Sequence, residues 1–401
     1  MKKDTMKLFN LEGVLVDKME ITDSEIAVFV RNPRRIAHCP RCGRGTKRIH
    51  QRKRRRVVHD VYNGRSVVLY VAVRRFMCGI CCVPFTERNI PGVGKSKFTE
   101  HFQHRVLYAV KTESFDSVAK RYKVSGPTIV SFLKANKRDI EWPSGDIKLA
   151  IDAHSFSGRD MKTTIGDMCS KRLLAVLADG GKGSLLKFLN SVPGDVKQRI
   201  SEVCIDMDRG YLAAITETLP NARVVVDHFH VVKELIRKMD EMRKILQHSG
   251  KRGQRRINRF LLLKNKENLS HAEMKELKRV FKEYEKFPAL YASWWVKESI
   301  RDMYRCKNVK TAQKKLEKIL LLLESYEVGV LAEIRGMLVR WKPYVLNYFY
   351  NRTTNAFAEG CNNKIKVTKR ISYGFRNFDN YVLKITLALT PFVFLGENLP
   401  H

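Results

Sequence analysis

The sequence predicts a multidomain α+β protein, and three observations support this prediction. Two Cys-x₂-Cys motifs stand among strand-like segments within residues 1–90. Short β-branched apolar runs alternate with amphipathic segments in residues 146–249, which is typical of an α/β sheet. Residues 250–345 are rich in Lys, Glu and Leu at helical spacing, so we expect an all-helical segment there. A chain of 401 residues is long enough to bury a separate core in each part.

The charge of the chain indicates the kind of partner it has. Lys and Arg number 76 against 41 Asp and Glu, a formal net charge of +35. Such a surplus on a globular composition favours DNA or RNA; the alternatives are a ribosome-bound protein and an anionic membrane surface. The longest apolar stretch, residues 385–396, is too short to span a membrane, and no secretory signal is apparent. We therefore expect a cytoplasmic, nucleoid-associated protein with no membrane partner.

Nine cysteines, clustered towards the N-terminus, fit metal ligation in a reducing compartment better than disulfides. Residues 7–31, which precede the first cysteine, alternate apolar and polar side chains as a β-hairpin does. Each Cys-x₂-Cys knuckle stands just beyond a strand and presents two sulfurs from one tight turn, so the pair predicts a ribbon with one structural Zn²⁺. Cys82, His38 and His59 are spare ligands nearby. The four predicted ligands are Cys39, Cys42, Cys78 and Cys81.

A strongly basic segment lies between the two knuckles. Residues 47–56 carry seven Lys or Arg in ten positions, and Asn63-Gly64 predicts a type I′ turn between the two strands that follow. The basic run is either a solvated face or a phosphate contact, and its place beside a zinc ribbon favours phosphate. The predicted DNA ligands are Arg52, Arg54, Arg55 and Arg56.

Residues 91–145 predict a helix-turn-helix. Phe115, Val118 and Tyr122 have helical spacing, the segment around Gly126 breaks the helix, and Pro127 suits the first turn of the next one. An ordinary helical hairpin is the alternative, and the basic charge of the chain favours DNA binding. The outward-facing residues of the second helix would then contact the major groove, and these are Thr128, Ser131 and Lys134.

Residues 146–249 predict the first part of a ribonuclease-H-like core. The apolar runs give three strands, a helix, a strand, a helix and a strand, which is the order of that fold. Sites in open α/β sheets lie beyond the carboxyl ends of the strands, where Asp152 and Asp206 stand. On spacing alone Asp208 and Asp227 are also near strand ends. Asp227 with His230 is either an accessory element of the site or the N-cap of a long helix from about residue 229.

Residues 346–401 are expected to supply the C-terminal helices of the core. Asn355, Glu359 and Asn362 share one helical face, so Glu359 can join two strand-end aspartates around a pair of Mg²⁺ or Mn²⁺ ions. A salt-bridged surface helix is the alternative. The predicted catalytic and metal-binding residues are Asp152, Asp206 and Glu359, and the predicted DNA ligands of this helix are Asn355, Asn362, Lys364, Lys366, Lys369 and Arg370.

Several phrases together resemble a bacterial insertion-sequence transposase of the DDE type, in the IS-L-three family. They are CPRCG with RRFMCGIC, VAKRYKVSGPTI, AIDAHSF, IDMDRGY, LPNARVVVDHFHVVK and TTNAFAEGCNNKIKVTKRISYGFRNF, and they cover nearly the whole chain in order. The resemblance implies Asp152, Asp206 and Glu359 as the catalytic triad, with the helical insertion between the second Asp and the Glu. Ala153 stands where the family often has an acidic residue.

The resemblance also implies partners and a reaction. Similar transposases bind double-stranded DNA at terminal inverted repeats, use divalent metal to hydrolyse the element ends, and attack target DNA with the freed 3′-OH. Two ends must be held together, so a homo-oligomer, a dimer or larger, is expected. Two other functions remain open: a catalytically silent, sequence-specific DNA-binding regulator, and a structure-selective nuclease or resolvase that uses the same core.

Overall fold

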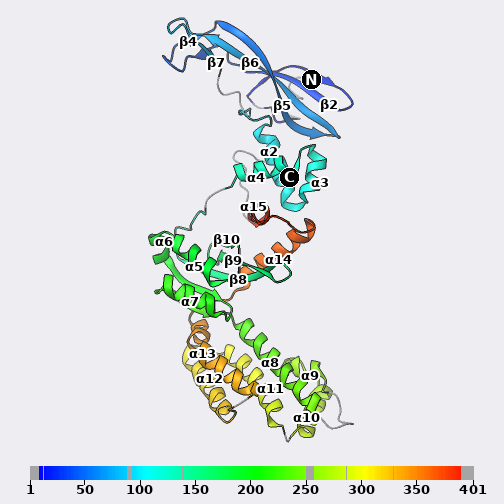
Figure 1. The fold of residues 1–401 in the computed structure, drawn as a ribbon, viewed down its shortest axis with the longest axis vertical. Coiled ribbons are helices and arrows are strands. Elements are labelled where there is room, and N and C mark those ends of the chain that lie inside the picture. Colours follow the sequence, from blue (N-terminus) through cyan, green and yellow to red (C-terminus); the bar gives the residue numbers. More distant parts are fainter. Residues whose placement is uncertain are drawn as a thin grey trace. The chain divides into compact units, whose positions relative to one another are not determined.

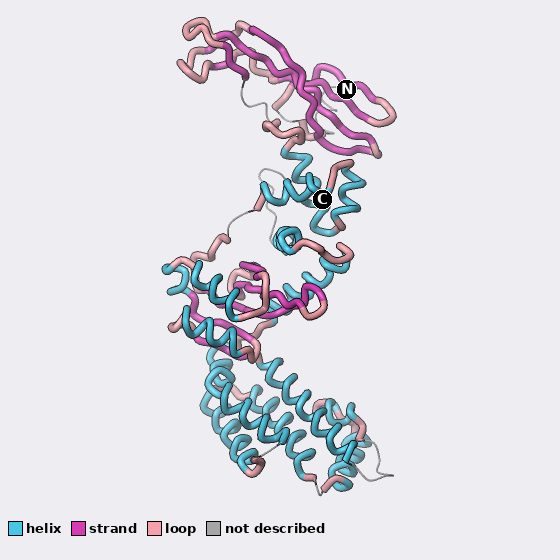
Figure 2. The backbone as a smooth tube through the Cα atoms, viewed as in Figure 1, coloured by secondary structure: helices cyan, strands magenta, loops and turns pink. Residues whose placement is uncertain are grey.

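A computed structural model describes residues 9–11, 13–87, 93–137, 140–249, 257–285, 287–327 and 329–389. The chain forms two compact units (Figure 1): Met1–Asp139 with Lys364–His401, and Ile140–Asn363. The first unit combines a strand-rich part with helices, and the second combines an α/β sheet with a long all-helical segment (Figure 2). Within the described residues, no helix has the length and apolar character needed to cross a membrane.

A five-stranded sheet dominates the first unit. Its order is β1-β2-β6-β5, with β7 paired to β6, and β2 runs parallel to β6. Alternate side chains of the strands bury one apolar face, which includes Val28, Val57 and Leu69. The strands are β1 Leu15–Ile21, β2 Glu25–Arg31, β5 Ile49–Tyr62, β6 Arg65–Met77 and β7 Pro84–Thr86, beside a small pair of β3 Ala37–His38 and β4 Gly45–Thr46.

The turn between β5 and β6 follows from its sequence. Asn63 and Gly64 both have positive φ, 45° and 73°, as a type I′ turn requires. This turn fixes the register in which Tyr62 faces Arg65, and the long antiparallel ladder extends from there.

His59 of β5 has a structural role and is not a spare zinc ligand. Its ring is 4% exposed, with Nε2 2.6 Å from the carbonyl oxygen of Phe9 and Nδ1 3.0 Å from the Thr99 hydroxyl. A neutral ring satisfies both contacts, because one nitrogen donates to the carbonyl and the other accepts from the hydroxyl. Burial, together with the charge of His101, lowers the pKa of His59 to about 4.

Acidification is therefore expected to destabilise the first unit through His59. The unfolded chain takes up a proton near pH 6.5, whereas folded His59 stays neutral until about pH 4, so stability falls as the pH decreases through that window. The free energy of unfolding should drop by up to about 3 kcal/mol more in the wild type than in His59→Gln. Urea titrations between pH 7 and pH 4 measure this difference. Equal pH dependence in the two proteins would contradict a buried neutral histidine.

Three short helices follow the sheet: α2 Glu100–Thr112, α3 Phe115–Tyr122 and α4 Gly126–Ala135. Lys123 ends α3 with φ 54°, in the left-handed region, and Ser125 caps α4 through its side chain. Only three residues separate α3 from α4, so the two helices form the tight pair expected of a helix-turn-helix. Val106, Ile129 and Phe132 are buried between the helices.

A fourth helix, α15 Phe378–Leu389, completes this helical core. Leu387 joins the apolar cluster of α2–α4, and α15 contacts both α2 and α4. The sequence prediction had grouped residues 346–401 with the core of the second unit, whereas the segment from Lys364 onward groups with the first unit. The physical reason is the apolar face of α15, which packs on the helix-turn-helix helices.

The sheet of the second unit has the order β10-β9-β8-β11-β12. The pairs β8–β9 and β9–β10 are antiparallel, whereas β11 lies parallel to both β8 and β12. Leu149, Ile151 and Val203 point to one face of the sheet, where they pack with buried residues of α5, α6 and α7. The elements are β8 Ile147–Ser157, β9 Asp160–Asp167, β10 Arg172–Leu177, α5 Lys182–Ser191, α6 Gly194–Arg199, β11 Ile200–Ile205, α7 Arg209–Thr218 and β12 Arg223–Val226.

An all-helical segment then leaves the sheet and returns to it. It begins with α8 at His228, where a long helix was expected from about residue 229, and ends with α13 at Asn351. Trp294 and Trp341 are buried in its core. The helices are α8 His228–Ser249, α9 Arg259–Leu263, α10 His271–Glu283, α11 Pro288–Tyr304, α12 Val309–Glu324 and α13 Gly329–Asn351, with a short 3₁₀ helix at Lys266–Asn268.

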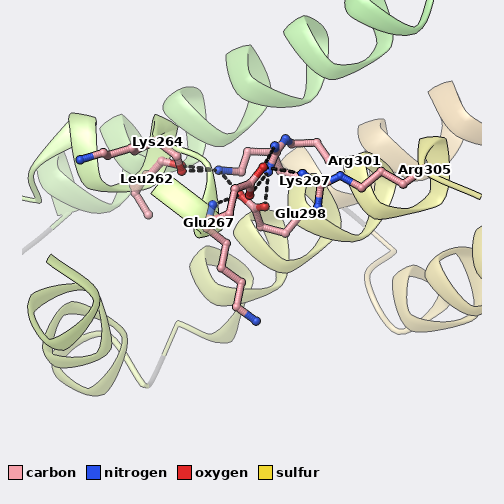
Figure 3. Close-up of polar contacts among 8 residues, drawn as sticks. Leu262, Lys264, Glu267, Lys297, Glu298, Arg301 and Arg305 are labelled. Atoms are coloured by element: carbon pink, nitrogen blue, oxygen red, sulfur yellow. Dashed lines mark hydrogen bonds and ion pairs between the residues drawn. The ribbon is translucent and has the colours of Figure 1, made fainter. Parts of the chain in front are cut away.

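A buried lysine ties α11 to the end of α9 (Figure 3). Lys297 is fully buried, and its Nζ donates to the carbonyls of Leu262 at 2.8 Å and Lys264 at 3.1 Å. Beside it, Glu298 pairs with Arg301 at 2.6 Å, and Glu267 pairs with Arg301 at 2.5 Å. Burial lowers the pKa of Lys297, and the carbonyls and the adjacent carboxylate satisfy its ammonium group.

Candidate active site and zinc centre

The two predicted catalytic aspartates lie on the same face of neighbouring strands. Residues 149 and 151 of β8 point into the core, so Asp152 points to the opposite face. The parallel register pairs Cys204 of β11 with Ala150 of β8. Asp206 directly follows β11, and continuing this register by two residues brings it beside Asp152, on which its charge acts. Both side chains are half-buried.

Helix α14, Ala356–Ile371, is held against this face by a chain of hydrogen bonds. Asn362 Nδ2 donates to Asp152 Oδ2 at 2.8 Å, and Asn362 Oδ1 accepts from the Thr164 hydroxyl at 2.7 Å. The same hydroxyl lies 2.8 Å from Nδ1 of buried His154. Since Thr164 uses its proton towards Asn362, His154 is the donor in that contact. This series of hydrogen bonds fixes the orientation of the Asn362 amide and therefore of the Asp152 carboxylate.

Glu359 stands between the two asparagines that fasten α14 to β8. Asn355, four residues earlier, donates from Nδ2 to the Ile151 carbonyl at 2.9 Å, and Asn362 is three residues later. Residues at these spacings share one helical face, so Glu359 lies on the face that meets Asp152. Its side chain is exposed. The three carboxylates do not gather within 4.8 Å of one another; among the described residues the four zinc-ribbon cysteines form the group that does.

His230 of α8 links Asp206 to Asp227. Its Nδ1 lies 2.9 Å from Asp206 Oδ1 and 3.4 Å from Asp227 Oδ2. The shorter contact, with Asp206, is an ion pair, whereas the longer contact, with Asp227, has hydrogen-bond geometry. Asp227 also accepts from the backbone N–H of Phe229 at 3.3 Å, at the start of α8. Asp227 therefore bonds the start of α8 and also contacts His230, which pairs with Asp206.

The charges of this cluster shift one another's pKa values. Burial, and then the charge of Asp206, raises the pKa of Asp152. Contacts with Asp206 and Asp227 raise the pKa of His230 to about 10, so its ring is cationic at neutral pH. Burial alone would raise the pKa of Asp227, but its contacts with His228 and His230 outweigh burial and lower that pKa to about 2. A site with this much negative charge is suited to a cation.

Asp208 has a separate function. Its Oδ1 accepts from the backbone N–H of Tyr211 at 2.8 Å, which makes Asp208 the N-cap of α7. The hydroxyl of Tyr211 in turn lies 2.7 Å from the Thr163 hydroxyl. The geometry thus separates Asp206, beside Asp152, from Asp208, which starts a helix.

Gly166 of β9 allows α14 to approach the sheet closely. A Cβ atom at this position would lie 2.5 Å from Cε1 of Phe357, on the first turn of α14, and 3.3 Å from the Arg172 carbonyl oxygen. Separations below 3 Å are not tolerated, so a side chain here would push Phe357 and its helix away from β9.

Gly166→Ala is expected to lower the free energy of unfolding by about 1–3 kcal/mol and to slow catalysis by about tenfold to a hundredfold, because Glu359 and Asn362 move with the helix. Gly336→Ala is the matched control, since its Cβ would meet nothing within 4 Å inside α13 and should stabilise by about 0.5–1 kcal/mol. Urea denaturation and a DNA cleavage assay measure the two effects. Wild-type behaviour of Gly166→Ala would contradict the close approach.

The four predicted zinc ligands meet in the first unit. All four Sγ atoms lie within 4.8 Å of one another, and those of Cys42 and Cys78 are 3.6 Å apart. Tetrahedral Zn–S bonds of about 2.3 Å place sulfurs about 3.8 Å apart, so the spacing fits zinc. Backbone N–H groups of Cys81 and Ile80 lower the pKa of Cys78 to about 6, which favours the thiolate. The donor set and its spacing support a structural zinc ion.

The residues after the two knuckles show how each turn closes. Gly43 follows the first knuckle with φ 72°, and Cys82 follows the second with φ 51°. Both positions need the left-handed backbone conformation, in which a glycine has no Cβ penalty. Cys82 is exposed and occupies this turn position outside the four-sulfur group, and His38 bonds the Gly43 carbonyl at 3.1 Å. The spare ligands are therefore part of the scaffold.

The four arginines of β5 differ in their surroundings. Arg52 is exposed, Arg54 lies 5.6 Å from the centre of the Phe29 ring, and Arg56 pairs with Glu25 at 2.7 Å. Arg55 donates to the Ser96 carbonyl. Arg52 is thus the most readily available to a phosphate, and the other three also make contacts within the protein.

The predicted DNA ligands of the two helices are mostly at the surface. Ser131 and Lys134 of α4 are exposed, whereas Thr128 is half-buried and its hydroxyl lies 2.9 Å from that of the cap residue Ser125. On α14, Lys364, Lys366 and Arg370 are exposed, and Lys369 is half-buried with a pKa lowered by burial. Asn355 and Asn362 of the same helix are instead buried and bonded to β8.

Two site residues escaped the sequence prediction, His154 and Thr164. His154 stands two positions after Asp152 and therefore on the same face of β8, and Thr164 is the cross-strand partner of Asp152. The sequence AIDAHSF contained a signal for His154, because a polar residue two positions after Asp152 lies on the same face of a strand. Thr164 could be found only from the pairing register of β8 with β9, which the sequence does not give.

Comparisons with known proteins agree with this arrangement. A model of the ISL3-type DDE transposase family, described as transposase, matches residues 149–385, and one described as the zinc-finger of transposase IS204/IS1001/IS1096/IS1165 matches residues 35–81. The transposase for insertion sequence element IS1001 of Bordetella parapertussis is 24% identical over 395 residues, 94% of this chain and 95% of that protein. The transposase for IS1557 of Mycobacterium tuberculosis is 24% identical over 57% of each chain. The resemblance seen in the sequence is confirmed, and the chain belongs to the ISL3-type family of DDE transposases.

Proposed function

We propose that this protein binds the terminal inverted repeats of its insertion sequence and catalyses metal-dependent hydrolysis of the DNA ends followed by strand transfer. The observation that carries the proposal is the meeting of three elements around Asp152. Asp206 directly follows β11, and its charge acts on Asp152; α14 is bonded to the Asp152 carboxylate through Asn362, three residues from Glu359. The strand order of the sheet, with β8, β11 and β12 parallel, supports a ribonuclease-H-like core.

The donor set fits divalent metal. Asp152, Asp206 and Glu359 offer carboxylate oxygens, which hard cations prefer, and Asp206 Oδ1 is buried with the His230 ring as its ion-pair partner at 2.9 Å. Two Mg²⁺ or Mn²⁺ ions held by these residues would activate the attacking water or 3′-OH and stabilise the leaving oxygen.

The protein's own residues would orient and balance this site. Asp152 Oδ1 accepts from the Ala153 backbone N–H at 2.8 Å while Asn362 holds Oδ2, so the carboxylate cannot rotate freely. His230 carries a positive charge beside Asp206 and Asp227 and reduces the repulsion among the acids. Second contacts of this kind position metal ligands and tune their basicity.

The basic residues would supply the DNA contacts. Arg52 of β5, Ser131 and Lys134 of α4, and the exposed cations of α14 are available to phosphates or bases, and the net charge of +35 provides a strong sequence-independent attraction. We infer a nucleoid-associated protein that acts as a homo-oligomer, because both ends of an element must be held during strand transfer. The zinc ribbon would stiffen the surface that meets DNA.

The test uses purified protein and duplexes that carry the element's own ends, with Mg²⁺, Mn²⁺ or EDTA. Cleavage at the ends and joining to a supercoiled plasmid, dependent on the metal and absent with shuffled ends, are the expected results. Tight, specific binding of the ends with no cleavage in either metal would overturn the enzyme proposal and favour a DNA-binding regulator. Cleavage of branched DNA in preference to the ends would favour a structure-selective nuclease.

A further inference from the structure

The loop that follows α14 contains a tyrosine in a place where glycine is usual. Tyr373 has φ 54°, and the next residue, Gly374, has φ 90°. The N–H of Gly374 donates to the Lys369 carbonyl at 3.0 Å, and the N–H of Tyr373 donates to the Arg370 carbonyl at 3.1 Å. These two bonds form a Schellman motif, with Tyr373 at the left-handed position that ends the helix.

No packing contact of the Tyr373 side chain within the described residues offsets the energetic cost of its left-handed backbone. Left-handed backbone is costly for residues with a Cβ, and an aromatic side chain usually offsets such a cost by burial. The Tyr373 side chain is 96% exposed, the most exposed of the large hydrophobic residues that the structure describes. A residue that breaks a local rule without a packing gain points to function.

The loop itself is firmly anchored. Lys384 of α15 is fully buried, and its Nζ donates to the Ser372 hydroxyl at 2.8 Å and to the Glu113 carbonyl. Phe375, on the other side of Tyr373, packs its ring 6.3 Å from Phe115 of α3 and 5.4 Å from Tyr381. The residues on both sides of Tyr373 are thus fixed to the helix-turn-helix body. The exposed ring is presented from a rigid support.

The neighbouring residues are cationic. Arg370 lies on the last turn of α14 and Arg376 in the loop, and both are exposed. An aromatic ring between two arginines can stack on a base through its face while the guanidinium groups bind the adjoining phosphates. Stacking on a base needs an unpaired nucleotide, because the faces of paired bases inside a duplex are already covered by their neighbours.

We propose that Tyr373 stacks on an unpaired base of the bound DNA end, with Arg370 and Arg376 on the flanking phosphates. This inference rests on the proposed function, since it names the feature of the DNA that the loop recognises. Tyr373 contributes to substrate recognition in it and has no part in the chemistry of the carboxylates. The ring recognises single-stranded character at the end, whichever base is present.

The test compares two probes, a blunt duplex of the element end and the same duplex with a three-nucleotide single-stranded extension. Wild type and Tyr373→Phe are expected to bind the extended probe about tenfold more tightly than the blunt one, and Tyr373→Gly should lose this preference. The glycine variant also removes the strained conformation, so its Tm should stay the same or rise by up to about 3 °C. Phe260→Ala, which removes a ring that is 76% exposed in the helical segment, is the matched control and should keep the preference.

The outcomes separate this inference from the function on which it rests. A glycine variant that keeps the preference, or that loses the same affinity for both probes, overturns the stacking role alone. A change of oligomeric state in Tyr373→Gly, with DNA binding unaltered, overturns it in favour of a protein contact at this loop. A wild-type protein that binds neither probe overturns the proposed function as well.

Discussion

Asp152→Asn and Glu359→Gln are each expected to reduce cleavage of the element ends by at least about a thousandfold, a loss of about 4 kcal/mol of transition-state stabilisation. Each substitution replaces a charged oxygen by a neutral amide of the same shape, so the fold and the DNA contacts remain while metal affinity falls. Asp152 should be the more sensitive, because its carboxylate sits between Asp206 and the Asn362 amide.

The measurement pairs single-turnover cleavage with Mn²⁺ binding by electron paramagnetic resonance and DNA binding by gel shift. Asp195→Asn is the control, because Asp195 is an exposed residue of α6 that pairs loosely with Arg199 at 3.7 Å. It should cleave at the wild-type rate. Wild-type cleavage by Asp152→Asn would remove Asp152 from the site, and lost DNA binding in either variant would point to misfolding instead.

Cys78→Ser is expected to abolish zinc binding and to unfold the ribbon. Metal affinity in small zinc domains provides about 10–16 kcal/mol of apparent folding free energy, which exceeds the stability of most domains. Cys78 is 1% exposed, and its sulfur accepts a hydrogen bond from the Cys81 backbone N–H at 3.3 Å. Replacing Cys78 therefore removes a zinc ligand and the sulfur that orients the turn of the second knuckle. DNA binding should fall sharply with it.

Zinc content by mass spectrometry and limited proteolysis of residues 37–86 measure this effect. The control is Cys82→Gly, which removes a neighbouring thiol outside the four-sulfur group and relieves a left-handed residue. It should retain one zinc per chain and gain slightly in stability. A Cys78→Ser protein that still binds one zinc ion would mean that a different set of ligands holds the metal.

Periodicity and spacing in the sequence predicted the parts of the fold that depend on local chemistry. The apolar runs that end near Asp152 and Asp206 indicated strands, and the knuckle spacing indicated the four-sulfur group. The two tight turns, at Asn63-Gly64 and between α3 and α4, followed from residues that set φ or cap a helix. In each case a neighbour within a few positions decides the conformation.

What the sequence left open depends on register and on long-range packing. Asp206, Asp208 and Asp227 were equivalent by spacing, and in the sequence the family resemblance alone favoured Asp206; in the structure the alignment of β11 with β8 and the cap on α7 distinguish Asp206 from Asp208. The membership of α15 was also hidden, because its apolar stripe does not specify the partner on which it packs. The same holds for Asn355 and Asn362, expected at DNA and found bonded to β8.

Residues 356–389 contribute contacts to both units. Asn362 reaches Asp152 across 210 positions, and Lys384 reaches Glu113 across 271 positions. A fragment of the protein that lacks these residues has neither Glu359 nor the contribution of α15 to the apolar cluster of α2–α4. If the proposed function holds, such a fragment cannot assemble the three carboxylates, and we expect it to be inactive in the cleavage assay.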